Sequence, residues 1–527
     1  MDMDQLCLMA LATILLTFIL RQVLGGKGTG ARLPPGPWNL PVIGSLHHLV
    51  ATKLPPHRAL FRLSRRHSPL MLLRLGEVPN VIVSTPEAAM LVLKTNDLTF
   101  ATRTSGPTLD VVGSASEGII FAPYGEHWRQ MRKICVVELL SAMQVRRIQS
   151  IMQAEIAHLV ESVVAASSAS PSSASPSSGS AVIDVGKGLA RLTNSVIARA
   201  VFGGKSRQQE AYLRELDVMA ILGGGFSLVD LFPSSRLVRW LSSSGRAMRR
   251  LHSRMQSILG DIIQDRKETK VPNAATARDN EDLLDVLLRL GKEDTLSFPL
   301  TSEIISAVIF DIFSAATDTT AATLEWAMAE LVRNPQAMAR AKLEVRQMLG
   351  HRRSSNITSA DLVGLHYLRM VIKETLRLHP SAPLIHRASQ ENCRVMGYDI
   401  PKGTAVMINA FAVGRDTAHW GADAAEFRPE RFEGMSVEYS SQGPHMEYIP
   451  FGAGRRQCPG ALFATTMLEL VLANLLYHFD WAIPGGAGPE TLDMGEVFGI
   501  IVHTRSSLHL QASSACYLQD QTIGELS

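Results

Sequence analysis

One stretch decides the fold: Phe451-Gly452-Ala453-Gly454-Arg455-Arg456-Gln457-Cys458-Pro459-Gly460, a single cysteine in a glycine-rich turn. The apolar run 461–477 that follows has its large side chains at helical spacing, which predicts a buried helix. Cys458 would then precede the helix N-terminus, where the macrodipole and free backbone N–H groups favour a thiolate. A thiolate held there suits an axial bond to heme iron. The glycines let the backbone approach a flat cofactor closely, and Arg456 can pair with a propionate.

A lone cysteine is usually an ordinary buried thiol, but the residues around this one form a specific pattern. Phe451, Gly454, Arg456, Cys458 and Gly460 fill every defined position of Phe-x-x-Gly-x-Arg-x-Cys-x-Gly. The pattern resembles the heme-binding signature of the cytochrome P450 monooxygenases, in which a cysteine thiolate ligates the iron of heme b (iron protoporphyrin IX). The resemblance implies a mainly α fold with a smaller β-rich part, and it implies that Phe451, Arg456, Cys458 and Gly460 bind the cofactor, with Cys458 as the metal ligand.

Length, net charge and cysteine content limit the possible domain organisation and partners. A chain of 527 residues with 46% hydrophobic residues can form several domains or one unusually large helical domain. The net charge of +3 gives no reason to propose nucleic acid as a partner. The five cysteines are odd in number, scattered and without CxxC spacing, which argues against a disulfide framework or a zinc site and fits a reducing compartment.

The first 24 residues predict one N-terminal transmembrane helix. The apolar run from Leu6 to Leu20, extended past Arg21, approaches the roughly 20 residues that span a bilayer. A cleaved signal peptide is the alternative, but the start is acidic and the basic residues follow the run. Residues 25–41 are basic and then proline-rich, which predicts a stiff linker, and 42–527 would form the catalytic domain. The resemblance implies an endoplasmic-reticulum membrane protein with a cytosolic catalytic domain.

Periodicity predicts further elements. We expect two short strands at 70–75 and 81–84, a helix at 86–93 and a long loop at 100–121. We also expect a disordered Ser/Ala/Pro surface loop at 165–181 and a glycine-rich break between helices at 221–233. The glycine-rich break resembles the lid over the substrate in plant members of the family, which faces the membrane.

Two further sites follow from spacing and resemblance. Trp128 and Arg132 are four residues apart and share one helical face, as a simple packing pair would. Beside the heme signature they resemble the family's propionate-binding pair, and Arg387 matches another propionate ligand. Glu374 and Arg377, taken alone, form an unremarkable surface pair. Together with a downstream arginine in 427–432 they resemble the family's Glu–Arg–Arg lock, which holds the heme-binding loop in place.

A long, mostly apolar segment, Glu303 to Ala327, predicts a central helix that contains Asp318 and Thr319. An acid and an alcohol inside a buried helix are costly unless paired or used. Hydroxyls bonded to i−4 carbonyls and a structurally paired acid are the alternative. The run resembles the family's oxygen-activation segment, with Ala316 where a glycine commonly stands. The resemblance implies that Thr319 holds a proton-carrying water and that Asp318 relays protons from solvent.

Neither Gly-x-Gly-x-x-Gly nor a Walker-type loop is present, so electrons must come from another protein. The resemblance implies NADPH–cytochrome P450 reductase, with cytochrome b5 as a further candidate and Arg455 and Lys133 on the docking surface. Three alternatives remain: a heme-thiolate isomerase or dehydratase, a non-enzymatic heme sensor, and a thiol hydrolase. The acid–alcohol pair argues against the first, and no His/Asn arrangement near Cys458 supports the last.

The substrate is predicted from the segments that the resemblance places over the heme. These are 105–120, 221–231, 307–317, 382–385 and 497–501, and they carry apolar residues, glycines and a few hydroxyls, with Asp110, Glu117, Asp230 and Asp311 as exceptions. No Arg or Lys among them could pair with an acidic ligand, which favours a lipophilic, nearly uncharged molecule. Resemblance to plant microsomal members of specialised metabolism favours a terpenoid, a sesqui- or diterpene, ahead of phenolic or indole-derived compounds.

Overall fold

The computed structural model describes residues 31–104, 106–112, 118–168, 181–204, 207–222, 227–269, 281–293, 296, 298–350, 357–439 and 445–515. The predicted transmembrane helix (1–24) lies outside these ranges, as do linker residues 25–30 and residues 169–180 of the predicted Ser/Ala/Pro loop.

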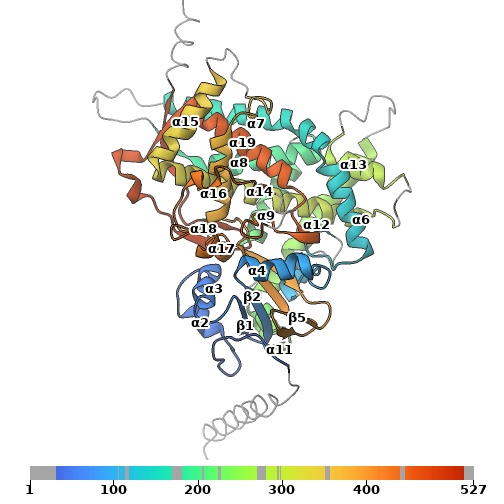
Figure 1. Cartoon of the computed structure of the whole chain (residues 1–527). Coiled ribbons are helices and arrows are strands. Elements are labelled where there is room, and N and C mark those ends of the chain that lie inside the picture. The colour runs from blue at the N-terminus through green and yellow to red at the C-terminus, as the bar shows by residue number, and fades with distance from the viewer. Residues whose placement is uncertain are drawn as a thin grey trace, which may run out of the picture.

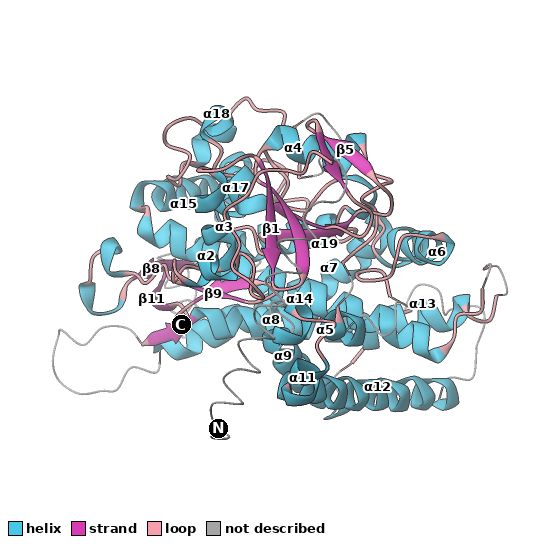
Figure 2. Cartoon of the chain, turned by 90° about the horizontal axis from the view of Figure 1, so that it is seen from below, coloured by secondary structure: helices cyan, strands magenta, loops and turns pink. Residues whose placement is uncertain are grey.

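Helices make up most of the described chain (Figure 2), which confirms the mainly α fold. The central helix is α14 (Ser302–Arg333), which packs against α8 (Val185–Phe202) and α19 (Ala461–His478). Among the described residues, α14 and α19 are the two helices long and apolar enough to cross a membrane, yet most of each is buried in the protein. A helix that is apolar on all sides and covered by others is a core helix. The other α-helices are α2 (Leu46–Val50), α3 (Pro56–Ser64), α4 (Pro86–Met90), α5 (Pro107–Val112), α6 (Glu126–Ile134), α7 (Ala142–Ser168), α9 (Arg207–Leu222), α10 (Leu228–Leu231), α11 (Arg236–Leu241), α12 (Ser243–Thr269), α13 (Leu283–Leu290), α15 (Pro335–Leu349), α16 (His366–Leu378), α17 (Ala410–Val413) and α18 (Thr417–Trp420).

Strands β1, β2 and β5 lie at one end of the molecule, near α2, α3 and α11 (Figure 1). The main sheet has the order β1-β2-β7-β4, in which β2 and β7 run parallel and the other neighbours antiparallel. A second sheet, β3-β11-β8, and two hairpins, β9–β10 and β5–β6, are antiparallel. The strands are β1 (Leu70–Leu75), β2 (Val78–Val83), β3 (Val182–Asp184), β4 (Leu384–Ala388), β5 (Cys393–Val395), β6 (Tyr398–Ile400), β7 (Ala405–Asn409), β8 (Phe479–Ala482), β9 (Glu496–Phe498), β10 (Val502–Thr504) and β11 (His509–Ser514).

Most predicted elements are confirmed, and the differences have local causes. The hairpin of β1 and β2 is present, with its second strand beginning at Val78, so that the turn is shorter than expected. The predicted disordered loop 165–181 is wrong for its first four residues, because α7 continues to Ser168. The hydroxyls of Ser167 and Ser168 donate to the carbonyls four residues earlier, at 2.8 and 2.9 Å, so the polar side chains are satisfied within the helix. Short helices also interrupt the predicted loop 100–121 (α5) and the glycine-rich break (α10).

The described part of the predicted linker lies along the main sheet. Leu72 N–H donates to the carbonyl of Pro35 at 2.9 Å, and the backbone of Arg32 bonds with Asp399 in both directions. A Cβ at Gly36 would lie 2.0 Å from the carbonyl oxygen of Leu72, so only glycine allows this approach. Residues 31–41 are therefore attached to the catalytic domain rather than extended freely from it.

Candidate heme-binding site

The cysteine loop is closed by its own backbone. Cys458 N–H donates to the carbonyl of Phe451 at 2.9 Å, so the two ends of the signature meet. Gly454 has a φ of +69°, and a Cβ there would lie 2.2 Å from the carbonyl oxygen of Leu93. The glycine is therefore required by close packing on a neighbouring backbone. Gly460 caps α19, which places Cys458 just before the helix, as the sequence predicted.

Cys458 is exposed, although enough protein surrounds its thiol for burial to affect its pKa. Burial raises the pKa of Cys458, and the Gly460 N–H and the charge of Arg132 lower it only in part. The helix N-terminus and its N–H groups are thus present as expected, but they do not by themselves produce a thiolate. A metal ion bound to the sulfur supplies the missing charge, since a coordinating thiol is deprotonated outright.

Trp128 and the predicted arginines meet beside this loop. The guanidinium of Arg456 lies 4.3 Å from the Trp128 ring centre, and that of Arg132 lies 5.5 Å from it. The Trp128 indole donates to the carbonyl of Ile119 at 2.9 Å, and Arg132 donates to that of Gln457 at 2.7 Å. The i, i+4 pair on α6 therefore lies at the cysteine loop, which Arg132 contacts directly.

A fourth arginine, the half-buried Arg103, belongs to the same group. It donates to the carbonyls of His386 and Ile120, at 2.7 and 3.1 Å. No spacing or motif marks it in the sequence, because it reaches the site from the loop after η1 (Leu91–Thr95). Its only sequence signal is a cation beside a segment that is otherwise rich in Gly, Ser and Thr.

The four arginines form a positive cluster in which Arg387 and Arg456 are buried and the other two are half-buried. Burial is the first cause that lowers each pKa, to about 10 for Arg103 and about 9 for Arg456, and neighbouring arginines lower the pKa of Arg387 further. Within the described ranges, Arg103, Arg132, Arg387 and Arg456 donate to backbone carbonyls and form no ion pair. Buried cations without a counter-charge are unfavourable unless an anion binds. The two propionates of heme fit this demand, and the exposed thiol fits its iron.

The predicted oxygen-activation residues lie on α14. Thr319 Oγ1 donates to the carbonyl of Ala315 at 2.5 Å, which is the i−4 bond that the sequence left open as an alternative. Ala315 is exposed although most of α14 is buried, which indicates open space at this point of the helix. Burial raises the pKa of Asp318, and the charge of His503 opposes that rise. β10 (Val502–Thr504), the strand that carries His503, packs against α14.

Comparison with known proteins identifies the family and supports the fold. A family model described as Cytochrome P450 matches residues 34–510. A desmethyl-deoxy-podophyllotoxin synthase of Sinopodophyllum hexandrum is 43% identical over 518 residues, covering 98% of each chain. An ent-isokaurene C2/C3-hydroxylase of Oryza sativa subsp. japonica is also 43% identical and covers 96% of each chain. A zebra fish cytochrome P450 solved with progesterone superposes with a TM-score of 0.71 at 24% identity, over 87% of this chain and all of that one, which supports the fold.

Proposed function

The chain belongs to the cytochrome P450 family of heme-thiolate monooxygenases, and from this premise we propose that it hydroxylates a terpenoid of plant specialised metabolism, a sesqui- or diterpene. Cys458 would hold the iron, and Trp128, Arg132, Arg387 and Arg456 would hold the propionates, joined by Arg103. The bound heme supplies the oxygen-activating chemistry, while the protein orients substrate and controls protons.

The proposed substrate class rests on the hydrogen bonding of two acids, Asp311 and Asp230, in the segments that the resemblance places over the heme. Asp311 accepts from the backbone N–H groups of Ile119 and Ile120, at 2.5 and 3.1 Å. Asp230 accepts from the Thr108 N–H at 2.9 Å and from the Ser227 hydroxyl at 2.6 Å. Both carboxylates are therefore engaged with the protein. The other residues of the segments that the resemblance places over the heme are mainly apolar, which favours a lipophilic molecule held mainly by shape.

The relatives support a terpenoid in different degrees. The ent-isokaurene hydroxylase is named for a diterpene. The podophyllotoxin-forming relative is equally similar to this chain, so podophyllotoxin precursors form the second class to be tested.

We assign the proton-handling role to Thr319 and Asp318. The Thr319 hydroxyl donates to Ala315 but keeps lone pairs with which it can accept from a water. Asp318 is half-buried, so its carboxyl can exchange protons with groups outside the site.

Electrons would come from NADPH–cytochrome P450 reductase, with cytochrome b5 as a further donor. Lys133 is exposed on α6, next to Arg132 of the arginine cluster. Arg455 is exposed on the cysteine loop, although Asp97 pairs with it at 3.3 Å and reduces its free charge. Lys133 is thus the better candidate of the two for docking an acidic partner.

Membrane association is supported by apolar residues at the β-rich end. Leu237, Trp240 and Leu241 of α11 are all more than 60% exposed. The turn after β1 bonds to both the N-terminal segment and α10, because Gly76 N–H donates to the carbonyl of Ile43 and Glu77 N–H to that of Leu231. α2 and α11 lie at the same end of the molecule (Figure 1). An exposed aromatic and leucine face beside arginines is typical of an interfacial helix. We therefore propose that this end rests on the endoplasmic-reticulum membrane, with the catalytic domain in the cytosol.

The function is tested in microsomes that contain this chain, the reductase and NADPH under oxygen-18 gas. Terpene hydrocarbons and podophyllotoxin precursors are offered separately, and products are analysed by mass spectrometry. A hydroxylated terpene that carries one oxygen-18 atom is the expected result. A product without the label would indicate an isomerase or dehydratase, and heme binding without NADPH-dependent product would indicate a sensor.

A further inference from the structure

One acid of the central helix bonds to the backbone beside the arginine cluster. Asp311, buried on α14, accepts with a single oxygen, Oδ2, from the N–H groups of Ile119 and Ile120 at 2.5 and 3.1 Å. The fit is close, because a Cβ at Gly118 would lie 2.2 Å from the same oxygen, so only glycine allows this approach. Asp311 therefore fixes this backbone segment on α14.

The carbonyls of the same two residues accept from side chains assigned to the heme. The Ile119 carbonyl accepts from the Trp128 indole at 2.9 Å and from Arg456 Nη1 at 3.2 Å. The Ile120 carbonyl accepts from Arg103 Nε at 3.1 Å. The Ile119 carbonyl and the Ile120 N–H belong to one planar peptide group, so a bond to the N–H also fixes the direction of the carbonyl.

The carbonyls orient the guanidinium groups without using all of their donors. Arg456 donates to the carbonyls of Ala101, Ile119 and Ala122, which takes three of its five N–H groups. Arg103 donates to two carbonyls. Within the described part of the chain, each guanidinium is thus held in one orientation and keeps donors for an anion such as a propionate.

We propose that Asp311 is a positioning residue for the heme that acts through the backbone. Its carboxylate orients the peptide groups of Ile119 and Ile120, and these hold the side chains that bind the propionates. The role rests on the proposed function of Trp128 and the arginine cluster. Hydrogen bonds on the two sides of one peptide group polarise one another, so loss of the Asp311 bond also weakens the bonds on the carbonyl side. It leaves two N–H groups without their acceptor, which favours movement of the segment away from α14.

The first test reads the propionates directly. Resonance Raman spectra of the resting holoenzyme contain propionate bending bands, whose frequencies depend on the hydrogen bonds that the propionates accept. Asp311→Ala should shift these bands, while Asp311→Asn keeps an acceptor oxygen and should return them most of the way to the wild-type positions. Gly118→Ala leaves the acid in place but crowds its Oδ2, and it should shift the bands as Asp311→Ala does. Wild-type bands in Asp311→Ala would overturn the proposal.

The second test measures heme transfer from the holoenzyme to apomyoglobin. We expect Asp311→Ala to transfer heme about tenfold faster than the wild type, and Asp311→Asn to transfer it at close to the wild-type rate. Neither substrate nor reductase is present in the two tests, so their results do not depend on the proposed substrate class. An unchanged transfer rate in Asp311→Ala would overturn the proposal.

Glu344 supplies a matched control. Its carboxylate also accepts from two successive backbone N–H groups, those of Tyr367 and Leu368 at 2.7 and 2.9 Å, but these lie in the first turn of α16. Glu344→Ala should lower the melting temperature and keep the wild-type bands and transfer rate. The same band shift in Glu344→Ala as in Asp311→Ala would mean that lost stability moves the propionates, and it would overturn the proposal.

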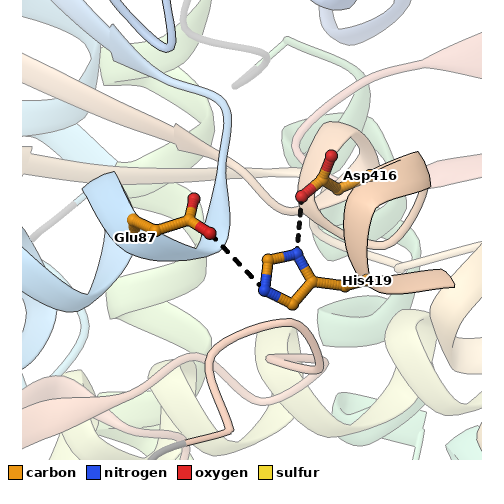
Figure 3. A group of neighbouring side chains, drawn as sticks. All are labelled: Glu87, Asp416 and His419. Atoms are coloured by element: carbon orange, nitrogen blue, oxygen red, sulfur yellow. Dashed lines mark hydrogen bonds and ion pairs between the residues drawn. The ribbon is translucent and has the colours of Figure 1, made fainter.

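A second control uses an acid that bonds to a neighbouring side chain. Asp416 accepts from His419 Nδ1 at 2.7 Å, and Nε2 of the same ring lies 3.4 Å from Glu87 Oε1, between α4 and α18 (Figure 3). Asp416→Ala should therefore match the wild type in its bands and in its transfer rate. A band shift as large as that of Asp311→Ala would also overturn the proposal.

Arg456→Gln separates the role of Asp311 from the assignment of the arginines. It removes a guanidinium assigned to the propionates and should shift the bending bands by itself. Shifted bands in Arg456→Gln with wild-type bands in Asp311→Ala would overturn the role of Asp311 and leave the arginines as propionate ligands. Wild-type bands in both variants would overturn the two together.

Discussion

Glu374 and Arg377 lie one turn apart on α16 and form a fully buried ion pair with two bonds, 2.6 Å from Oε2 to Nε and 2.8 Å from Oε1 to Nη2. Glu374 Oε1 also accepts from Arg431 Nε at 2.9 Å, so Arg431 is the third member of the predicted Glu–Arg–Arg lock. Arg377 in turn donates to the carbonyls of Gly414 and Ala424, both at 2.6 Å. The pair therefore fixes the segment that precedes the cysteine loop, and it is not a surface pair.

Glu374→Gln should destabilise the protein strongly. It leaves the guanidinium groups of Arg377 and Arg431 buried without a counter-charge, a change that typically costs about 3–5 kcal/mol. We expect a lower midpoint in urea unfolding and less heme retained after purification. Arg428→Ala is the control, because Arg428 pairs with Asp423 while its own side chain is half-exposed, and such pairs contribute less than about 1 kcal/mol. Equal losses in the two variants would contradict the lock.

Cys458→Ala should abolish thiolate ligation. The wild-type reduced carbon monoxide adduct should show the red-shifted Soret band that thiolate-ligated heme gives, and the variant should lack it. Cys393→Ala, at a partly buried cysteine in β5, should keep the band. A histidine-like band in the wild-type protein would refute the assignment of Cys458.

Arg103→Gln should loosen the heme. The variant removes one of the four positive charges of the cluster and two hydrogen bonds, to the carbonyls of His386 and Ile120. We expect faster transfer of heme to an acceptor such as apomyoglobin, by roughly tenfold for about 1.4 kcal/mol of lost interaction. Arg455→Gln changes an exposed arginine on the same loop as Cys458 and should transfer heme at the wild-type rate.

The sequence predicted those parts of the site whose residues lie close together in the chain. The cysteine loop, Trp128 with Arg132, and Glu374 with Arg377 have fixed local spacing, and the structure brings each group together. Arg103 could not be found in this way, because a tertiary contact places it beside His386, 283 positions away. Burial of the Glu374–Arg377 pair was equally invisible, since an i, i+3 ion pair reads the same on a surface and in a core.

Asp311 should make stability depend on pH. Burial raises its pKa from 3.8 to about 7, although the N–H groups of Ile120 and Ile119 and the charge of Arg103 oppose the rise. Between pH 3.8 and about pH 7, the Asp311 carboxyl keeps its proton in the folded state but has lost it in the unfolded state. The contribution of Asp311 to the free energy of unfolding therefore falls as pH rises from about 4 to about 7.

Asp311→Asn tests this sign, because an amide keeps the acceptor oxygen and carries no charge. The melting temperature of the variant relative to wild type should be higher at pH 8 than at pH 5. The same difference at both values would show that the carboxylate of Asp311 stays ionised in the folded protein throughout this range.

Thr319→Ala should separate electron consumption from product formation. The variant keeps a good helix former in α14 and loses only the hydroxyl that bonds to Ala315 and that can hold a water. NADPH oxidation should continue, while most reducing equivalents appear as hydrogen peroxide and the product formed per NADPH falls about tenfold.

Thr319→Ser should restore much of the coupling, because it returns the hydroxyl. Thr323→Ala, which removes a hydroxyl one turn further along that bonds to the Thr319 carbonyl at 2.8 Å, should remain coupled. Full coupling in Thr319→Ala would mean that this hydroxyl serves only its i−4 bond, and proton control would then rest with Asp318 and its neighbours.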